Sequence, residues 1–207
     1  MTSARRPVKR RSYHHGDLKK TLVERAIHLL RTEGPDALTL RGVARAAGVS
    51  QAAPYRHFAS RRELIGAVAE DGFRNLKETM LAHVAGQGGR AGLKGIAIAY
   101  VDFAMQNPGQ YRIMFGPDLA TTEDLPSLGA TSRDVLGFVG EGLRGLQGAG
   151  LVGKGDVSSM AVAIWAMLHG LVMLTLDGVT NNVAPPLETL LDDATRIMMF
   201  GMAPRPD

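Results

Sequence analysis

The chain has 207 residues, of which 45% are apolar, and it contains no cysteine. This composition allows a hydrophobic core and excludes a disulfide framework, a thiolate metal site and a cysteine nucleophile. Residues 1–62 hold 14 Lys and Arg against 4 Asp and Glu, whereas residues 63–207 hold 10 against 16. A basic unit followed by a mildly acidic body favours a polyanionic partner for the first part, although a solvated basic tail would also explain the charge.

The first elements in chain order are a basic arm and a long helix. Residues 1–12 show no periodicity, so we expect a disordered arm, and the absence of an apolar segment argues against a secretory signal. Apolar residues then recur at helical spacing from Asp17, which can cap a helix by accepting backbone N–H bonds. Gly34 followed by Pro35 stops the pattern, so the sequence predicts a helix over about 17–33.

Two short helices are expected next. Thr39 is placed to cap a helix that ends at Ala47, and Gly48 supplies a tight turn after it. Ser50 is then expected to cap a third helix that ends near His57. Two short helices joined by a tight turn, with a supporting helix in front, are the parts of a helix-turn-helix, whose second short helix enters the major groove of DNA.

The start of this second short helix suits contact with base edges. Gln51 can bond adenine through two hydrogen bonds, and Ala52 and Ala53 are small enough to approach a thymine methyl group. Pro54 departs from an ideal helix, because it lacks an N–H group and biases the preceding residue away from α geometry. We therefore expect a distorted first turn and weigh the phosphate contacts of the following residues more heavily.

The residues after this turn suit contact with the DNA backbone. Tyr55, Arg56 and His57 can reach phosphates or base edges. Arg61 lies in the first turn of the next helix, where free N–H groups already favour a phosphate. The complete set of candidate DNA-contacting residues is Thr39, Arg41, Ser50, Gln51, Ala52, Ala53, Tyr55, Arg56, His57 and Arg61.

The rest of the chain is predicted to be helical. Ser60 and Glu63 are spaced as a capping box for a connecting helix over about 60–84. The segment GQGGRAG at 86–92 is expected to be a linker, because it is dense in glycine. Further helices are expected over about 93–106, 108–115, 127–149, 156–178 and 187–201.

Several segments resemble one family. The run LTLRGVARAAGVSQAAPYRHFASRRELI resembles the helix-turn-helix signature of the TetR family of transcriptional regulators, and YHHGDLKKTLVERAIHLL resembles a subset that begins with a YHHGDL-like segment. Further on, NPGQYRIMFGPDL and WAMLHGLVMLTL resemble the effector-binding domain of that subset, which is named for a Trp-His-Gly motif. In this chain the motif is spread out, since Trp165 is separated from His169-Gly170.

One helix near the carboxyl end is apolar enough to raise the question of a membrane. Residues 157–176 contain no charged side chain and are long enough to span a bilayer. Small and polar residues interrupt the segment, and no second segment of this kind follows. We therefore expect a helix buried in a core and a subunit interface, and no membrane partner.

The larger region offers adaptable apolar side chains that suit a small hydrophobic effector. His169 and Tyr111 are the polar groups expected to orient a ligand, although His169 could instead be a hydrogen-bonded core residue and the methionines could be simple core packing. The candidate ligand-binding residues are Phe103, Met105, Tyr111, Met114, Phe115, Trp165, His169 and Met173. No metal site is expected, because His14-His15 lacks a third ligand at a plausible spacing.

The fold is therefore predicted to be all-α. A three-helix helix-turn-helix domain over 13–62 precedes a helical ligand-binding and dimerisation domain over 63–207. No nucleophile-base-acid set appears, so we expect no enzyme and no cofactor. The resemblance implies a cytoplasmic homodimer that binds double-stranded DNA at a near-palindromic operator, represses transcription and releases DNA when an effector binds. An architectural DNA-binding protein, and a helical enzyme or lipid carrier that retains the first domain, are the alternatives.

Overall fold

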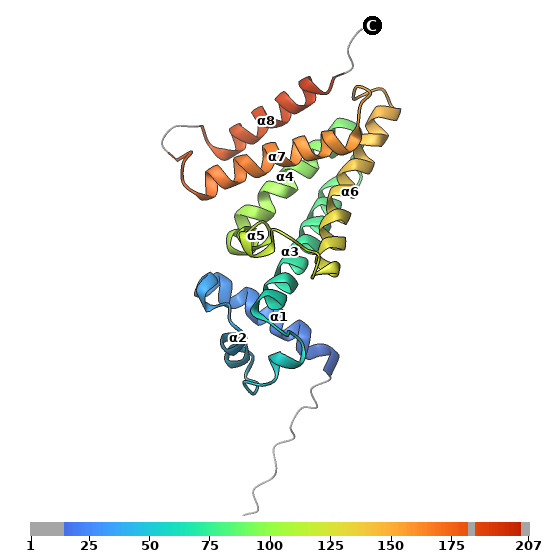
Figure 1. Ribbon diagram of the computed structural model, residues 1–207. Helices are drawn as coiled ribbons and strands as arrows, with labels where there is room; N and C mark the ends of the chain where they lie inside the picture. Colours follow the sequence, from blue (N-terminus) through green and yellow to red (C-terminus); the bar gives the residue numbers. More distant parts are fainter. Residues whose placement is uncertain (1–14, 182–184, 204–207) are drawn as a thin grey trace, which may run out of the picture. The chain divides into compact units, whose positions relative to one another are not determined.

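The computed structural model describes residues 15–181 and 185–203, and every regular element within them is a helix (Figure 1). The predicted all-α class is therefore confirmed. The chain divides into two compact units, Met1–Leu64 and Ile65–Asp207. The arm predicted over 1–12 lies outside the described residues, as do Tyr13 and His14.

The first unit is a small helical head. Its elements are α1 (His15–Thr32), η1 (Pro35–Ala37), α2 (Leu40–Ala47), η2 (Pro54–Arg56) and the first residues of α3 (Arg61–Val84). Helix α1 packs against α2. Leu22, Ala26, Leu38, Val43 and Phe58 are buried between these elements. Leu22, Ala26 and Val43 lie on the inward helix faces that their spacing predicted, and Leu38 and Phe58 join them from the connecting segments.

Both ends of α2 follow from local chemistry. The Thr39 side chain accepts a hydrogen bond from the backbone N–H of Gly42 at 3.0 Å, so the predicted cap is confirmed. Gly48 adopts φ 67°, in the left-handed region, and its N–H donates to the carbonyls of Ala44 and Arg45. A residue with a Cβ is strained in that conformation, which explains why glycine makes this turn.

The expected third α-helix over Ser50–His57 is wrong. Residues 51–53 form a turn, and only Pro54–Arg56 complete a single turn of 3₁₀ helix. The backbone bonds are of the three-residue kind, from Ala53 N–H to Ser50 O at 3.0 Å and from Arg56 N–H to Ala53 O at 3.2 Å. Pro54 has no N–H to give the Ser50 carbonyl, so an α-helix cannot be continued through it and Ser50 does not cap one.

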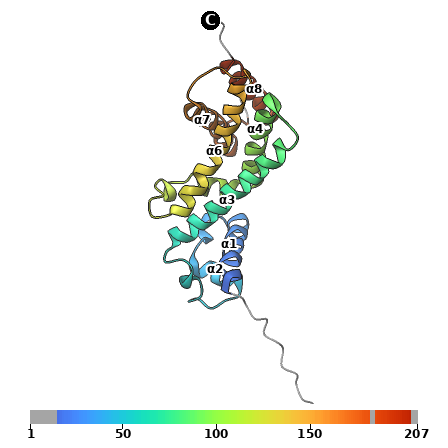
Figure 2. The ribbon, with the colours of Figure 1, turned by 90° about the vertical axis from the view of Figure 1, so that its right-hand side faces the viewer.

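The second unit contains the rest of α3 and five further helices. These are α4 (Gly89–Gln106), α5 (Pro108–Met114), α6 (Pro126–Gly148), α7 (Val157–Leu176) and α8 (Leu187–Gly201), with the short η3 (Pro117–Leu119) between α5 and α6. Helix α4 packs against α6, α7 and α8, and α7 packs against both α6 and α8 (Figure 2). The predicted helices are thus present, with ends shifted by a few residues.

The predicted glycine linker is mostly helical. Helix α4 begins at Gly89, so only residues 85–88 connect it to α3. A Cβ at Gly95 would lie 3.1 Å from the carbonyl oxygen of His83, and one at Gly92 would lie 3.3 Å from that of Gln87. These glycines therefore allow α4 to approach the end of α3 closely, which a composition-based assignment to a linker overlooks.

Helix α7 is the one described helix with the length and hydropathy to cross a membrane. Its mean hydropathy is 1.9 over a window of which only 22% is buried within the unit. A single helix of this kind is weak evidence for a membrane span, because core helices of water-soluble proteins pass the same test. Ala161, Ile164, Leu168 and Val172 form its buried stripe.

Candidate functional site

The residues predicted to contact DNA lie on the surface of the head. Eight of them are exposed, namely Thr39, Arg41, Ser50, Gln51, Ala52, Tyr55, Arg56 and Arg61, whereas Ala53 and His57 are half-buried. Pro54 and Phe58 are buried on either side of Tyr55 and Arg56. Because Pro54 and Phe58 are buried, the short 3₁₀ helix between them is held in place, and the side chains of Tyr55 and Arg56 point towards solvent.

Arg61 has a structural role that sequence reasoning missed. Its Nε–H donates to the carbonyl of Leu38 at 2.9 Å, and one terminal nitrogen donates to the carbonyl of Pro35 at 3.4 Å. The guanidinium therefore ties the start of α3 to the segment before α2. Of the candidate arginines, Arg41 and Arg56 are exposed and are better placed than Arg61 to contact phosphate.

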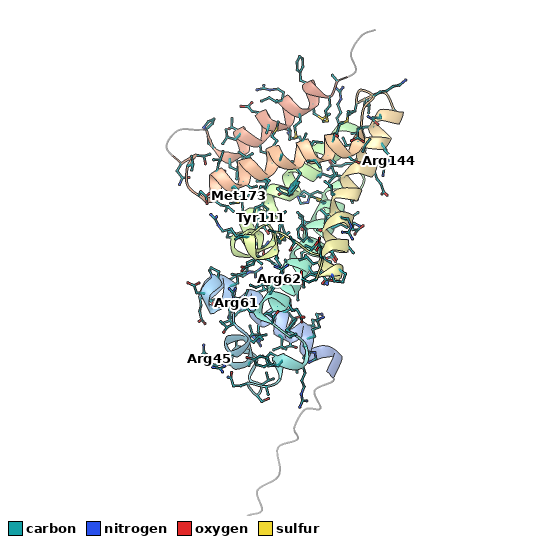
Figure 3. All side chains as sticks on the ribbon, viewed as in Figure 1. Arg45, Arg61, Arg62, Tyr111, Arg144 and Met173 are labelled. Carbon is teal, nitrogen blue, oxygen red and sulfur yellow. The ribbon has the colours of Figure 1, made fainter. Side chains whose placement is uncertain are left out.

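One exposed cation of the head was not among the candidates. Arg45 lies one helical turn after Arg41 on α2, and its side chain extends from the head in Figure 3. The four-residue spacing of these two arginines places them on one face of α2, which is the sequence signal that could have found Arg45.

The second unit contains an apolar cavity of about 290 Å³. Most of its lining is aliphatic or aromatic and comes from five helices and the segment between α5 and α6. The lining residues are Phe73, Leu76, Met80, Ile96, Tyr100, Met114, Phe115, Leu119, Thr122, Leu128, Ser132, Arg133, Val135, Leu136, Val139, Ala161, Ile164, Trp165 and Leu168. A concave, mostly apolar site with a few polar groups is the usual form of a small-molecule site.

A hydrogen-bonded polar cluster lies at one end of this cavity. Trp165 Nε1–H donates to Tyr100 Oη at 3.1 Å, the Tyr100 and Tyr111 hydroxyls are 2.7 Å apart, and Tyr111 Oη lies 2.6 Å from His169 Nδ1. The indole can only donate, so Tyr100 Oη accepts from it, and Tyr100 Oη also lies 3.3 Å from His169 Nδ1. The two hydroxyls and the imidazole nitrogen therefore form one closed group of hydrogen-bond partners.

Burial keeps the groups of this cluster in their uncharged forms. It lowers the pKa of His169, which favours the neutral ring. Burial also raises the pKa of Tyr100 to about 12 and raises that of Tyr111. The cluster is therefore uncharged near neutral pH.

The predicted ligand-binding residues divide between the cavity and its surroundings. Met114, Phe115 and Trp165 line the cavity. Tyr111 is fully buried behind it and His169 is half-buried, so both act through the polar cluster. Phe103 and Met173 lie one helical turn beyond Tyr100 and His169, and Met105 points to another side of α4; none of the three lines the cavity.

Sequence reasoning missed the polar lining residues Tyr100, Thr122, Ser132 and Arg133. Ile96 and Tyr100 are one helical turn apart, as are Leu128 and Ser132, so the inward faces of α4 and α6 were visible in the spacing. Within residues 15–181 and 185–203 no three His, Asp or Glu side chains gather as metal ligands.

Comparison with known proteins identifies the family of both units. Residues 22–68 match the family described as "Bacterial regulatory proteins, tetR family", and residues 93–198 match "Tetracyclin repressor-like, C-terminal domain". The chain is 30% identical over 168 residues to the uncharacterized HTH-type transcriptional regulator Rv0681 of Mycobacterium tuberculosis, a match that covers 80% of this chain and 73% of the relative.

Solved structures agree with this assignment. A protein of unknown function from Rhodococcus sp. RHA1 has a TM-score of 0.82 and 32% identity, over 94% of this chain and 100% of that one. The TetR family transcriptional regulator PfmR from Thermus thermophilus has a TM-score of 0.65 and 18% identity, over 86% and 97%, and so shares the fold. The chain therefore belongs to the tetR family of bacterial regulatory proteins, and it is a DNA-binding transcription regulator rather than an enzyme.

Proposed function

We propose that the protein is a cytoplasmic homodimeric repressor that binds a near-palindromic operator and releases it when a small hydrophobic effector occupies the cavity of the second unit. The observation that carries this proposal is the apolar cavity of about 290 Å³ in a chain whose head is a helix-turn-helix. A regulator that only coated DNA would need no such cavity. Membership of the subset with a YHHGDL-like start remains our prediction.

Exposed apolar side chains support a dimer formed through α7 and α8. On α7, Val162, Met167 and Leu174 are between 38% and 49% exposed, and on α8 Ile197 and Phe200 are 60% and 86% exposed. An apolar surface of this kind on a water-soluble domain marks an interaction site. Members of this family typically dimerise, and a symmetric pair would bring two heads to half-sites about 34–36 Å apart on DNA.

Helix α3 supports a route from cavity to operator. Its first residues, Arg61–Leu64, belong to the head, and its later residues Phe73, Leu76 and Met80 line the cavity. An effector releases DNA only if it binds the non-operator conformation better than the operator-bound one. A coupling free energy of about 1–3 kcal/mol would lower operator affinity roughly 5–150-fold.

Selection of DNA from a random pool by the purified full chain tests the DNA-binding half of the proposal. We expect enrichment of one inverted repeat, and fluorescence anisotropy should then give an affinity for it about 10³-fold or more above that for scrambled DNA at fixed salt. Equal affinity for both would instead support an architectural protein.

Effector release is tested with compounds that quench the fluorescence of Trp165. By linkage, a true effector weakens operator binding by the same factor by which operator weakens effector binding. A compound that binds equally well with and without operator is not an effector, and a repeat with Leu76→Phe, which narrows the cavity and adds no second tryptophan, should weaken both effects together.

A further inference from the structure

The cavity has polar lining residues that do not belong to the hydrogen-bonded cluster. Ser132 and Arg133 come from α6 and Thr122 from the segment before it, among lining residues that are otherwise almost entirely apolar. The Ser132 hydroxyl donates to the backbone carbonyl of Gly129 within α6 at 3.2 Å. The Thr122 hydroxyl and the Arg133 guanidinium are therefore the groups left to meet a ligand.

These two groups converge over a glycine. A Cβ at Gly129 would lie 2.9 Å from Thr122 Oγ1 and 3.2 Å from Arg133 Nη1. The absence of a side chain at Gly129 thus allows the hydroxyl and the guanidinium to lie together against α6. Both are hydrogen-bond donors, and one carries a permanent positive charge.

Neighbouring charges are already paired with one another. Asp134 binds Lys77 at 2.6 Å, and Glu70 accepts hydrogen bonds from Arg74 at 2.5 Å and from Ser127 at 2.8 Å. Within the described part of the chain, Arg133 has no carboxylate within 4 Å. Arg133 is exposed where it lines the cavity, so it is positioned at the solvent-accessible side, and its planar fork fits the carboxylate of a ligand that enters there.

The two polar groups of the cavity differ in the ligand group they suit. The cluster of Tyr100, Tyr111 and His169 is neutral, and its members hydrogen-bond to one another. The lining beside it therefore suits an apolar or aromatic body, and the ring centroids of Phe115 and Trp165 are 5.7 Å apart there. An anionic group suits Arg133.

We propose that the effector is an amphipathic carboxylate whose acid group binds Arg133 and Thr122 and whose apolar body fills the cavity towards Trp165. At about 30 Å³ for each water-sized group, a cavity of about 290 Å³ admits about ten non-hydrogen atoms. This inference deepens the proposed function and rests on it, because it names the chemical class of the effector.

Isosteric ligands test the charge requirement. Trp165 is the only tryptophan in the chain, so its fluorescence in the full-length protein reports binding at this cavity. The probes are octanoate and octanamide, which have ten non-hydrogen atoms each, and the pair 4-methylbenzoate and 4-methylbenzamide of the same size. We expect each acid to bind about tenfold tighter than its amide, the lower end of what a charge-assisted hydrogen bond contributes.

Matched variants show whether the acid preference comes from Arg133 itself or from the positive charge of the surface in general. Arg133→Gln should reduce the acid-to-amide ratio to about one, and Arg133→Lys should restore part of it. Arg144→Gln should keep the full ratio, since Arg144 is also exposed on α6 but does not line the cavity (Figure 3). Circular dichroism checks that each variant is folded.

Several outcomes overturn the assignment. Acid and amide could bind equally to the wild type, the preference could persist in Arg133→Gln, or neither acid could bind at millimolar concentration. Operator affinity, measured on the same samples without ligand, distinguishes failure of the carboxylate assignment from failure of the proposed function. A chain that binds its operator but shows no acid preference refutes only the carboxylate, whereas failure to bind any operator refutes the proposed function.

Discussion

The Tyr111 hydroxyl is the centre of the buried polar cluster, so removing it tests the hydrogen-bond network directly. In Tyr111→Phe the cluster loses the bond to His169 Nδ1 at 2.6 Å and the bond from Tyr100 at 2.7 Å, while shape is preserved. Tyr100 Oη lies 3.3 Å from His169 Nδ1 and can only partly replace the lost donor. At about 1 kcal/mol for each neutral hydrogen bond, the unfolding free energy should fall by about 2 kcal/mol.

Thermal unfolding followed by circular dichroism, at fixed protein concentration, measures this loss. For a chain of this length, about 2 kcal/mol corresponds to a drop of about 4–8 °C in Tm. Tyr55→Phe removes the same atom from a side chain that is 53% exposed, and it should leave Tm unchanged within about 1 °C. If Tyr111→Phe unfolds at the wild-type temperature, the hydrogen bonds of this hydroxyl contribute no net stability.

Three further predictions concern pH, DNA and assembly. Burial lowers the pKa of His169 in the folded chain, so as pH falls below about 6.5 the unfolded chain takes up a proton first and the free energy of unfolding decreases. Urea unfolding should therefore show a smaller decrease in unfolding free energy between pH 7 and pH 5 for His169→Gln than for the wild type. Arg56→Ala should weaken binding to every DNA sequence and reduce the salt slope by about one unit for each head, whereas Gln51→Ala should relax the preference at one base pair by about 1–3 kcal/mol. Ile197→Asp should halve the mass found by sedimentation, and an unchanged dimer would refute an interface through α8.

Some local signals in the sequence were reliable and others were not. The predicted cap at Asp17 is wrong, because α1 begins at His15 and Asp17 lies within it. The cap at Thr39 and the left-handed turn at Gly48 each depend on a few atoms of the same segment. The prediction of an α-helix after Ser50 was wrong for a related reason. Pro54 was identified as a distortion, but the loss of its N–H has more effect than the helical spacing of its neighbours, and a 3₁₀ turn results.

The cavity could not be predicted to the same extent, because it depends on which helix faces meet. Periodicity indicates that α4 and α7 each have an inward face, but it does not pair Tyr100 with Trp165, which lie 65 positions apart. His169 therefore remained either a ligand contact or a core residue until its partners were known. Arg133 was missed because it lies in a polar stretch of α6, between Ser132 and Asp134, and such a charged residue is normally on a solvated face.

Helix α7 serves two surfaces at once, and this has consequences for regulation. Trp165 lines the cavity and is also 38% exposed, next to the apolar residues that we assign to the dimer interface. Side chains that pack tightly between a ligand and a partner subunit cannot adapt to one without affecting the other. On the proposed function, occupancy of the cavity is therefore expected to change the packing of α7 as well as that of α3, and we expect an effector to act on the proposed dimer interface as well as on each head.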